Sequence, residues 1–248
     1  MKNNKLLVII PTLNEKDTIE IAIRKIVAAI PAVWILVVDD DSVDGTWQIA
    51  DDLKRGFSQI EIMVRRNVAH GLGYSIRDGF RYAIDHSFDE VCVVDCDLQQ
   101  DPSDIVTMRK VFPTSDIVIG TRFCSSESFV AGYDIASRLM SRLSNLIIRV
   151  LFLFPYKDAT TDFNWLSVRV FKGVPPESMI SKGYVFFVEL KIRAWKAGFS
   201  ISELAVPTYP RTCGHSGRSV RQIGIFTLEV LKLWFHLRCP DGRDRLYD

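Results

Sequence analysis

The stretch EVCVVDCDLQQDP, residues 90–102, joins a short apolar run to two aspartates, Asp95 and Asp97, and ends at a proline. The apolar run is typical of a buried strand, and side chains in a strand alternate between its two faces. If the extended backbone continues beyond this run, Asp95, Asp97 and Gln99 project to the same side. We therefore expect three oxygen-bearing side chains to meet at the end of this strand.

These three side chains are candidate metal ligands. Two neighbouring carboxylates repel one another and raise each other's pKa, and a hard divalent cation reverses that effect. Mg²⁺ or Mn²⁺ commonly binds one or two protein carboxylates together with substrate phosphates and water. The alternative role is helix capping, which suits Asp101 before Pro102 but does not account for Asp95 and Asp97.

Length, charge and cysteine content narrow the class of protein. The chain has 248 residues, 48% of them apolar, which suits one domain with a sizeable core. Its 31 basic and 30 acidic residues leave a formal charge of +1, so composition does not favour a nucleic-acid partner. The five cysteines lack CxxC spacing, which predicts reduced thiols and a cytoplasmic location. The first apolar run meets Pro11 too soon for a signal peptide.

Further apolar runs alternate with amphipathic stretches, at residues 6–10, 34–40, 60–64, 91–95 and 116–120. This alternation predicts an α/β fold with a Rossmann-like, mostly parallel central sheet and helices on both faces. Ligands of such sheets bind beyond the carboxyl ends of the strands. There the chain carries PTLNE (11–15), DDDSVDGT (39–46) and DCDLQQDP (95–102). The second half shows helical periodicity at 133–154 and 186–199, on either side of a polar segment at 157–164.

Taken together, these segments resemble family 2 glycosyltransferases. The matching motifs, in chain order, are IIPTLNE, VVDDDSVDGT, GLGYSIRDGF, VVDCDLQQDP, IVIGTRF, SRLMSRLSN, DATTDF and GYVFFVELKIRAWKAGFSISELAVPTYPRTCGHS. Within that family the chain is most similar to dolichyl-phosphate mannose synthases and other polyprenyl-phosphate glycosyltransferases. The resemblance implies a GT-A fold, a nucleotide-sugar donor such as GDP-mannose or a UDP-sugar, and a divalent metal. It also implies inverting transfer of one hexose to a polyprenyl or dolichyl monophosphate.

The resemblance assigns candidate site residues by position. Those at the nucleotide-sugar are Pro11, Thr12, Glu15, Asp39, Asp40 and Asp95, and those at the metal are Asp95, Asp97 and Gln99. Positions near the transferred phosphate groups are matched by Arg122, Arg138, Ser141 and Arg211. Arginine suits such a role because a guanidinium group holds phosphate oxygens in two-point contacts. We expect Asp97, Arg122 and Arg211 to be the catalytic residues.

The chain also departs from the family pattern. Leu13 replaces a usual aromatic residue, and Asn164 stands where the family mostly has a basic residue. The basic loop reads GHSG at 214–217, with Arg218 as the one substitute for the family's lysine. Relatives that glycosylate hydroxyl groups carry a Glu-Asp pair where this chain has Glu189 and Leu190, which argues against a hydroxyl acceptor. We expect Glu189 to orient Arg193.

Two alternative functions remain. One is a family 2 glycosyltransferase that acts on a sugar or small-molecule hydroxyl group. The other is a non-catalytic subunit that binds a nucleotide-sugar.

Two amphipathic stretches bear on the acceptor. Apolar residues recur from Ile135 to Phe154 with Arg138, Arg142 and Arg149 between them, a pattern that can lie in a membrane interface. The stretch at 223–239 is similar, and is too short and too charged to span a bilayer. We therefore predict a GT-A domain at 1–220 and an amphipathic tail at 221–248. The protein would bind the cytoplasmic face of a membrane peripherally, directly or through an anchoring subunit. Packing of both stretches against the domain is the alternative.

Overall fold

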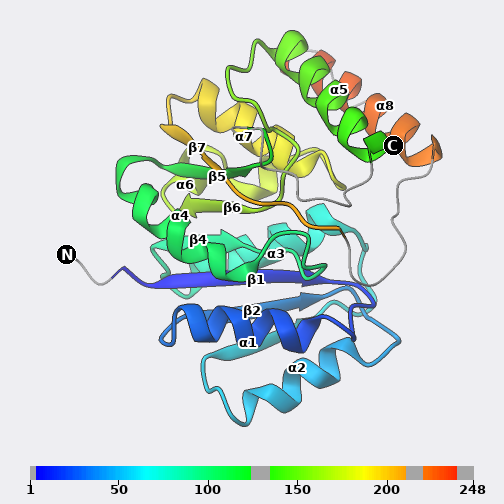
Figure 1. The fold of residues 1–248 in the computed structure, drawn as a ribbon. Coiled ribbons are helices and arrows are strands. Elements are labelled where there is room, and N and C mark those ends of the chain that lie inside the picture. Colours follow the sequence, from blue (N-terminus) through cyan, green and yellow to red (C-terminus); the bar gives the residue numbers. More distant parts are fainter. Residues whose placement is uncertain (1–3, 124–134, 211–219, 239–248) are drawn as a thin grey trace.

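One sheet organises the described residues of the computed structural model, which are 4–123, 135–210 and 220–238 (Figure 1). Its seven strands have the order β3-β2-β1-β4-β6-β5-β7. Their bounds are β1 Leu6–Thr12, β2 Trp34–Asp39, β3 Ile60–Val64, β4 Glu90–Val93, β5 Ile117–Thr121, β6 Asn164–Ser167 and β7 Ile201–Ala205. All pairings are parallel except those of β6 with β4 and β5. The five predicted strands and the mostly parallel sheet are confirmed; β6 and β7 were not predicted.

Helices cover both faces of this sheet, as expected. One face packs against α1 (Ile19–Ala29), α2 (Thr46–Lys54) and α4 (Ile105–Val111). The other packs against α3 (Leu72–Asp85), α6 (Val170–Gly173) and α7 (Phe186–Lys196), with α5 (Ile135–Phe152) and α8 (Val220–Arg238) beyond them. Short 3-10 turns occur at Pro102–Asp104, Phe112–Thr114 and Pro176–Ser178. The helices predicted at 133–154 and 186–199 correspond to α5 and α7.

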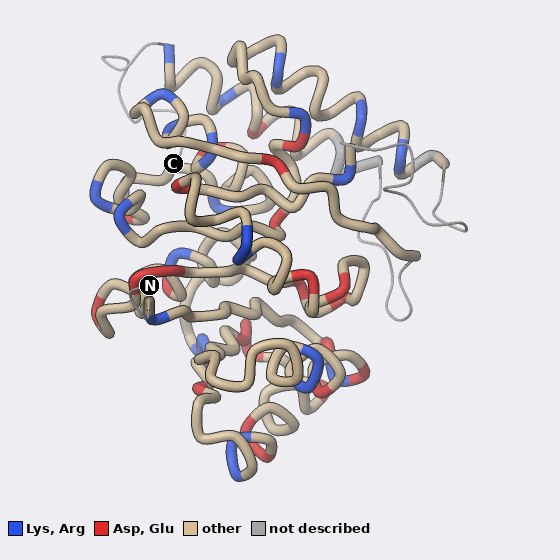
Figure 2. Tube along the Cα trace, turned by 60° about the vertical axis from the view of Figure 1, so that its left-hand side comes forward, with Lys and Arg blue, Asp and Glu red and all other residues tan. Residues whose placement is uncertain are grey.

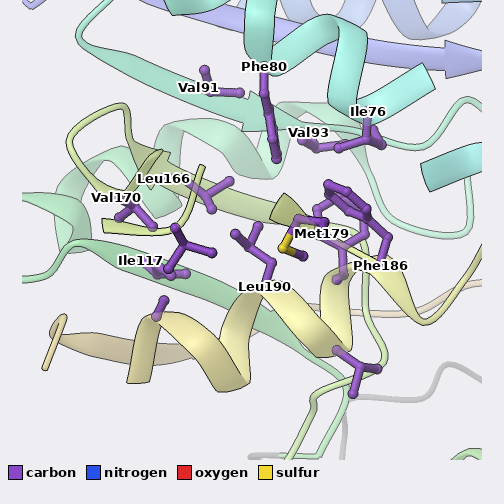
Figure 3. Packing of buried hydrophobic residues seen from close by; sticks show 14 of the residues in the cluster. Ile76, Phe80, Val91, Val93, Ile117, Leu166, Val170, Met179, Phe186 and Leu190 are labelled. Carbon is purple, nitrogen blue, oxygen red and sulfur yellow. The ribbon is translucent and has the colours of Figure 1, made fainter. Parts of the chain in front are cut away.

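Strand β1 lies inside the sheet, between β2 and β4, and is buried on both faces. Leu7 and Ile9 belong to the hydrophobic cluster beneath α3 and α7, while Val8 and Ile10 belong to the cluster beneath α1. Figure 3 shows part of the first cluster, in which side chains of α3 and α7 meet over the sheet. Burial on both faces explains why β1 reads as a continuous apolar run rather than an alternating one.

Pro11 is tolerated in this central strand because of where its neighbour ends. Strand β4 pairs with β1 only as far as Val93 opposite Ile9. The carbonyl group of Ile9 accepts a hydrogen bond from the N–H group of Val94, so the backbone groups of Ile9 face β4. Backbone groups of alternate residues in a strand face the same neighbour, so the nitrogen of Pro11 also points to that side, where β4 has already ended. A residue without an N–H group therefore removes no hydrogen bond from the sheet.

Asp40, directly after β2, connects three elements at the carboxyl edge of the sheet. Its carboxylate forms a buried ion pair with Arg65, which follows β3. It also accepts hydrogen bonds from Ser75 Oγ at 2.9 Å and from the N–H group of Gly71 at 2.6 Å, at the start of α3. Gly71 has a φ of +133°, which few other residues adopt. Gly71 therefore forms the turn that opens α3.

Helices α5 and α8 lie side by side on the outer edge of the molecule (Figures 1 and 2). Val230 and Leu233 of α8 are buried, and Trp234 Nε1 donates a hydrogen bond to the carbonyl group of Leu151 at 2.8 Å. Part of the predicted tail thus packs on the domain through one side of α8. Among the helices of the described segments, none combines the length and apolar content that crossing a bilayer needs.

The Asp40 ion pair yields a stability prediction. The side chains of Arg65 and Asp40 are 4% and 5% exposed, so Arg65→Met leaves a buried carboxylate without its charge partner. We expect the free energy of unfolding to fall by about 3–5 kcal/mol. Arg66 pairs with Asp41 at 55% and 44% exposure, so Arg66→Met is expected to change it by less than about 1 kcal/mol. Urea unfolding of both variants is the measurement, and equal losses would contradict the prediction.

Candidate active site

The turn that carries Asp95 and Asp97 begins immediately beyond β4. The strand ends at Val93, and Leu98 has a positive φ of 58°, so the expectation of an extended backbone up to Gln99 is wrong. The chain instead folds back on itself, and Asp97 Oδ1 accepts a hydrogen bond from the N–H group of Gln99 at 2.9 Å. The two aspartates are thus brought to this edge by a turn and not by strand alternation.

The surroundings of the turn are acidic and partly buried. Asp97 is buried, and Asp95 is partly exposed. Between them, Cys96 is buried, and its Sγ lies 3.5 Å from Thr18 Oγ1, which in turn donates to Glu15 Oε2 at 3.1 Å. Burial raises the pKa of the Cys96 thiol, and the charges of Glu15, Asp95 and Asp97 add to that rise. The negative charge of Glu15 therefore lies near those of Asp95 and Asp97, because all three act on the same thiol.

The donor set of this turn fits a small divalent cation. The described residues contain no group of three or more His, Cys, Asp or Glu side chains arranged to hold a metal. Two carboxylates are nevertheless the usual protein share of a Mg²⁺ site, which substrate phosphates and water complete. Asp101 does not belong to this set. It caps the following 3-10 turn by accepting from the N–H group of Ser103 at 2.9 Å, and it pairs with Lys25, as the capping interpretation predicts.

The three acids after β2 have separate environments. Asp39 is fully buried and accepts hydrogen bonds from Thr12 Oγ1, Ser42 Oγ and the N–H group of Ser42, each at 2.7 Å. Asp40 is held by Arg65 and Gly71, whereas Asp41 is 44% exposed in its side chain. The sequence places all three at one strand end, and the structure gives the first two internal partners. Asp44 accepts from Thr46 at the start of α2, so Asp44 and Gly45 form the turn that leads into this helix.

Arg122, directly after β5, is held by a buried carboxylate. Its Nε and Nη2 donate to the two carboxylate oxygens of Asp158, both at 2.8 Å, and its backbone N–H group donates to Asp158 at 3.1 Å. Burial alone would raise the pKa of Asp158, but the charge and hydrogen bonds of Arg122, together with the charge of Lys191, lower it to about 2. Asp158 therefore remains ionised and fixes the orientation of the guanidinium group.

The topology of the sheet explains why these two residues meet. Strand β6 runs antiparallel between β4 and β5, so the loop before β6 lies at the same edge as the segments after β4 and β5. This loop, residues 157–163, is called the Asp158 loop below. Gln100 Nε2 donates to Thr161 Oγ1 at 3.3 Å and so joins the Asp158 loop to the aspartate turn.

Several residues that hold the Asp158 loop had no role assigned from sequence. Asn145 of α5 donates to Thr160 Oγ1 at 3.0 Å and accepts from the N–H group of Ala159 at 2.7 Å. Lys191 of α7 is 1% exposed and donates to the carbonyl groups of Ala159 and Thr161 at 3.1 and 2.6 Å. The motifs SRLSN and DATTDF contained the signal for Asn145 and Asp158. Lys191 is signalled only by its place on an almost wholly buried helix.

A basic pocket of about 330 Å³ opens beside Arg122 and α5. Its lining residues are Arg122, Phe123, Arg142, Asn145, Leu146, Arg149 and Lys157, four of which are cationic and none acidic. Arg138 and Ser141 are partly exposed residues of the same helix. Arg211, and the loop at 214–218, lie outside the described residues. The structure thus gathers a basic surface on the side of Arg122 that faces α5.

Glu189 is fully buried and has internal partners. It forms an ion pair with Arg193 at 2.6 Å and accepts a hydrogen bond from the N–H group of Ser181 at 2.8 Å. The predicted contact between Glu189 and Arg193 is therefore present. A carboxylate held in this way is poorly placed to take a proton from a substrate.

The class of enzyme follows from comparison of the chain with known protein families. Residues 7–174 match the model of Glycosyl transferase family 2, and the chain belongs to that family. The protein is a glycosyltransferase. The family resemblance inferred from the sequence motifs is confirmed.

Relatives and solved structures extend this result. Over 98% of its length the chain is 26% identical to undecaprenyl-phosphate mannosyltransferase of Micrococcus luteus, covering 99% of that protein. Over 88% of its length it is 28% identical to polyprenol monophosphomannose synthase of Mycolicibacterium smegmatis, covering 83% of it. Glucosyl-3-phosphoglycerate synthase of Mycobacterium tuberculosis, crystallised with Mn²⁺, UDP and glucosyl-3-phosphoglycerate, superposes with a TM-score of 0.70 at 19% identity, over 96% of this chain and 81% of that one. The fold is the predicted GT-A fold.

The aspartate turn yields a second prediction. If Asp97 binds a divalent cation, Asp97→Asn should lower turnover at least about a hundredfold, the loss expected for a key electrostatic contact. Excess EDTA should abolish activity. Asp101→Asn is the matched control, because it changes a capping aspartate of the same segment and should leave turnover within about twofold. Full activity in EDTA, or equal losses in the two variants, would contradict a metal at this turn.

Proposed function

We propose that the protein is an inverting glycosyltransferase that moves one hexose from a nucleotide-sugar, GDP-mannose or a UDP-sugar, to a polyprenyl or dolichyl monophosphate. The observation that carries the proposal is the division of one sheet edge into two chemically different sides. The aspartate turn and the β1 and β2 ends are acidic, whereas the side of Arg122 that faces α5 is basic. The names of both curated relatives also state transfer to, or synthesis on, a polyprenyl phosphate.

The donor would lie over the acidic side. Asp95, Asp97 and Gln99 would hold Mg²⁺ or Mn²⁺, which when bound neutralises the developing charge of the leaving nucleoside diphosphate. Pro11, Thr12 and Glu15 would line the nucleotide from β1 and the segment after it. Asp39 and Asp40 would shape the region near the base mainly through the groups that already occupy their oxygens, Thr12 and Ser42 for Asp39 and Arg65 and Gly71 for Asp40.

The acceptor would lie over the basic side. A lipid monophosphate has a second pKa of about 6, by analogy with other phosphomonoesters, so near neutral pH it is already a nucleophile. Arg122, Arg138, Ser141 and Arg211 would hold its oxygens in line behind the anomeric carbon, which supplies placement and charge stabilisation. No general base is required. This agrees with Glu189, whose carboxylate is already bound by Arg193 and the N–H group of Ser181.

Helices α5 and α8 would bring this site to the membrane surface. Both leave large apolar side chains exposed: Ile135, Leu139, Leu143, Leu146, Ile147 and Val150 of α5, and Ile225, Leu228, Leu231 and Phe235 of α8. Helix α5 contains no acidic residue, and Figure 2 shows basic residues recurring along this helical layer. Such a surface suits an anionic bilayer. We place it on the cytoplasmic face, because the described cysteines, Cys92 and Cys96, are free thiols. An anchoring subunit on the same surface is the alternative.

The nature of the acceptor gives the test of this function. Polyprenyl phosphate should accept the sugar, and the corresponding polyprenol should be inert, because only the phosphate supplies an ionised nucleophile. Transfer of radiolabelled sugar to each lipid is the measurement. Turnover on polyprenol, or on a soluble sugar without lipid, would replace the proposal with a hydroxyl-acceptor reaction. Metal-dependent donor binding without turnover on any lipid phosphate would indicate a non-catalytic binding subunit.

The membrane surface gives a separate prediction. Leu139→Glu combined with Leu143→Glu adds two negative charges to α5 and should reduce sedimentation with anionic liposomes at least about fivefold, because both residues are over half exposed on the apolar face. Val43→Glu combined with Val68→Glu adds the same charge at exposed apolar residues elsewhere and serves as the control. Equal binding of the two double variants would show that α5 does not contact lipid.

A further inference from the structure

Lys191 is a buried cation that the proposed reaction does not use. It lies on α7, is 1% exposed, and belongs to a helix whose neighbouring side chains, Leu190 and Ile192, are core residues. A lysine is rarely buried to this extent unless specific partners compensate its charge. The position therefore demands an explanation other than packing.

The partners of Lys191 all belong to the Asp158 loop or surround it. Its ammonium group donates to the carbonyl groups of Ala159 and Thr161, on either side of Thr160. The charged groups that act on it are Asp158 and Asp162 in the loop, Arg122 after β5, and Glu203 on β7. Asp158 in turn binds Arg122 through three hydrogen bonds. A continuous chain of contacts thus runs from Lys191 through the loop to the guanidinium group proposed to bind phosphate.

Asn164 adds a second observation. Asn164 is buried, and its Nδ2 donates to the carbonyl group of Thr161 at 3.0 Å. Lys191 Nζ donates to that same carbonyl group at 2.6 Å. Two side chains from different elements, Asn164 of β6 and Lys191 of α7, therefore hold the same carbonyl group of the loop.

We infer that Lys191 is a positioning residue, whose charged ammonium group holds the Asp158 loop in the conformation in which Asp158 orients Arg122 toward the acceptor phosphate. The inference deepens the proposed function and rests on it. Lys191 does not touch the reacting atoms. It acts through the carbonyl groups of Ala159 and Thr161 and, beyond them, through the ion pair of Asp158 with Arg122. Its removal should therefore lower kcat/KM for the acceptor and leave the affinity for the donor unchanged.

The effect of Lys191 on the free energy of unfolding distinguishes a positioning role from a purely structural one. Burial lowers the pKa of Lys191 to about 7, although Asp158 and Asp162 oppose the shift. In the unfolded chain the lysine remains protonated up to its ordinary pKa near 10.5, so between about pH 7 and 10.5 the unfolded state binds more protons. Stability from this group therefore rises with pH in that window, and at pH 6.5 the buried charge lowers it. At pH 6.5 a neutral residue of similar length removes this cost but also removes the two hydrogen bonds to Ala159 and Thr161, so we expect little net change in stability.

The rate of sugar transfer should also depend on the protonation of Lys191. Ionisation of the acceptor phosphate gives a rate that rises through about pH 6. Loss of the proton from Lys191 gives a rate that falls as the pH rises through about 7. A protein general base would have the opposite effect and raise the rate through its own pKa.

The experiment compares Lys191→Met, Lys191→Arg and the control Lys196→Met, an exposed lysine of the same helix. At pH 6.5 we expect Lys191→Met to keep its thermal stability and donor binding while losing about ten- to a hundredfold in kcat/KM for polyprenyl phosphate, as for other residues that orient a site group. Lys191→Arg, which stays charged, should retain activity and lack the alkaline fall. Wild-type kinetics and an unchanged pH profile in Lys191→Met would overturn the inference, as would a loss fully explained by unfolding.

A second measurement is independent of the acceptor. The N–H groups of Ala159, Thr160 and Phe163 are hydrogen-bonded within the loop or to Asn145. Their hydrogen exchange should accelerate at least about tenfold in Lys191→Met and not in Lys196→Met, since local opening exposes these groups. If the wild type transfers sugar to no lipid phosphate, the proposed function is wrong, and this exchange still decides whether Lys191 holds the loop. Unchanged exchange would overturn the inference.

Discussion

The fully buried carboxylate of Asp158 constrains the whole site. A buried charge is tolerated only when opposite charge and hydrogen bonds compensate its lost hydration. Asp158 obtains these from Arg122 after β5, Asn145 of α5 and its own loop, and the loop obtains further support from Lys191 of α7. Removal of one partner leaves the others uncompensated. Elements from distant parts of the chain are therefore fixed in one mutual arrangement, and Arg122 is oriented before any substrate arrives.

The antiparallel strand β6 makes this arrangement available. In a purely parallel sheet, only segments that follow strands reach the carboxyl edge. Because β6 runs the other way, the segment that precedes it reaches that edge too, between the ends of β4 and β5. The Asp158 loop therefore separates the aspartate turn from Arg122. An acidic and a basic region therefore stand side by side, which suits the proposed reaction between a nucleoside-diphosphate sugar and an anionic acceptor.

Both regions are organised by charges whose burial is costly. Asp39, Asp40 and Arg65 form one buried polar group at the proposed donor side, and Asp158, Arg122 and Lys191 form another at the proposed acceptor side. Hydrophobic side chains of similar volume would often be as stable or more so at such positions. Preorganised dipoles and charges are nevertheless what stabilise developing charge in a transition state, because they need not reorient during the reaction. The pattern is that of a site whose stability is limited by its function.

Local patterns in the sequence determined the first five strands, the helices at α5 and α7 and the cap at Asp101. Each depends on periodicity or on neighbours a few residues away, so no tertiary information is needed. Family motifs placed Arg122 and the aspartate turn at the site, but not the geometry that holds them. The strand β6 is only four residues long and begins at the last residue of the polar segment 157–164, and Asp158 meets Arg122 across 36 residues of chain. Lys191 appears in the sequence as an ordinary helical lysine, and only the packing of α7 against the Asp158 loop makes it a buried cation. Such contacts depend on strand order and on which surfaces meet, and these are set by the hydrophobic packing of the whole chain rather than by any local pattern of residues.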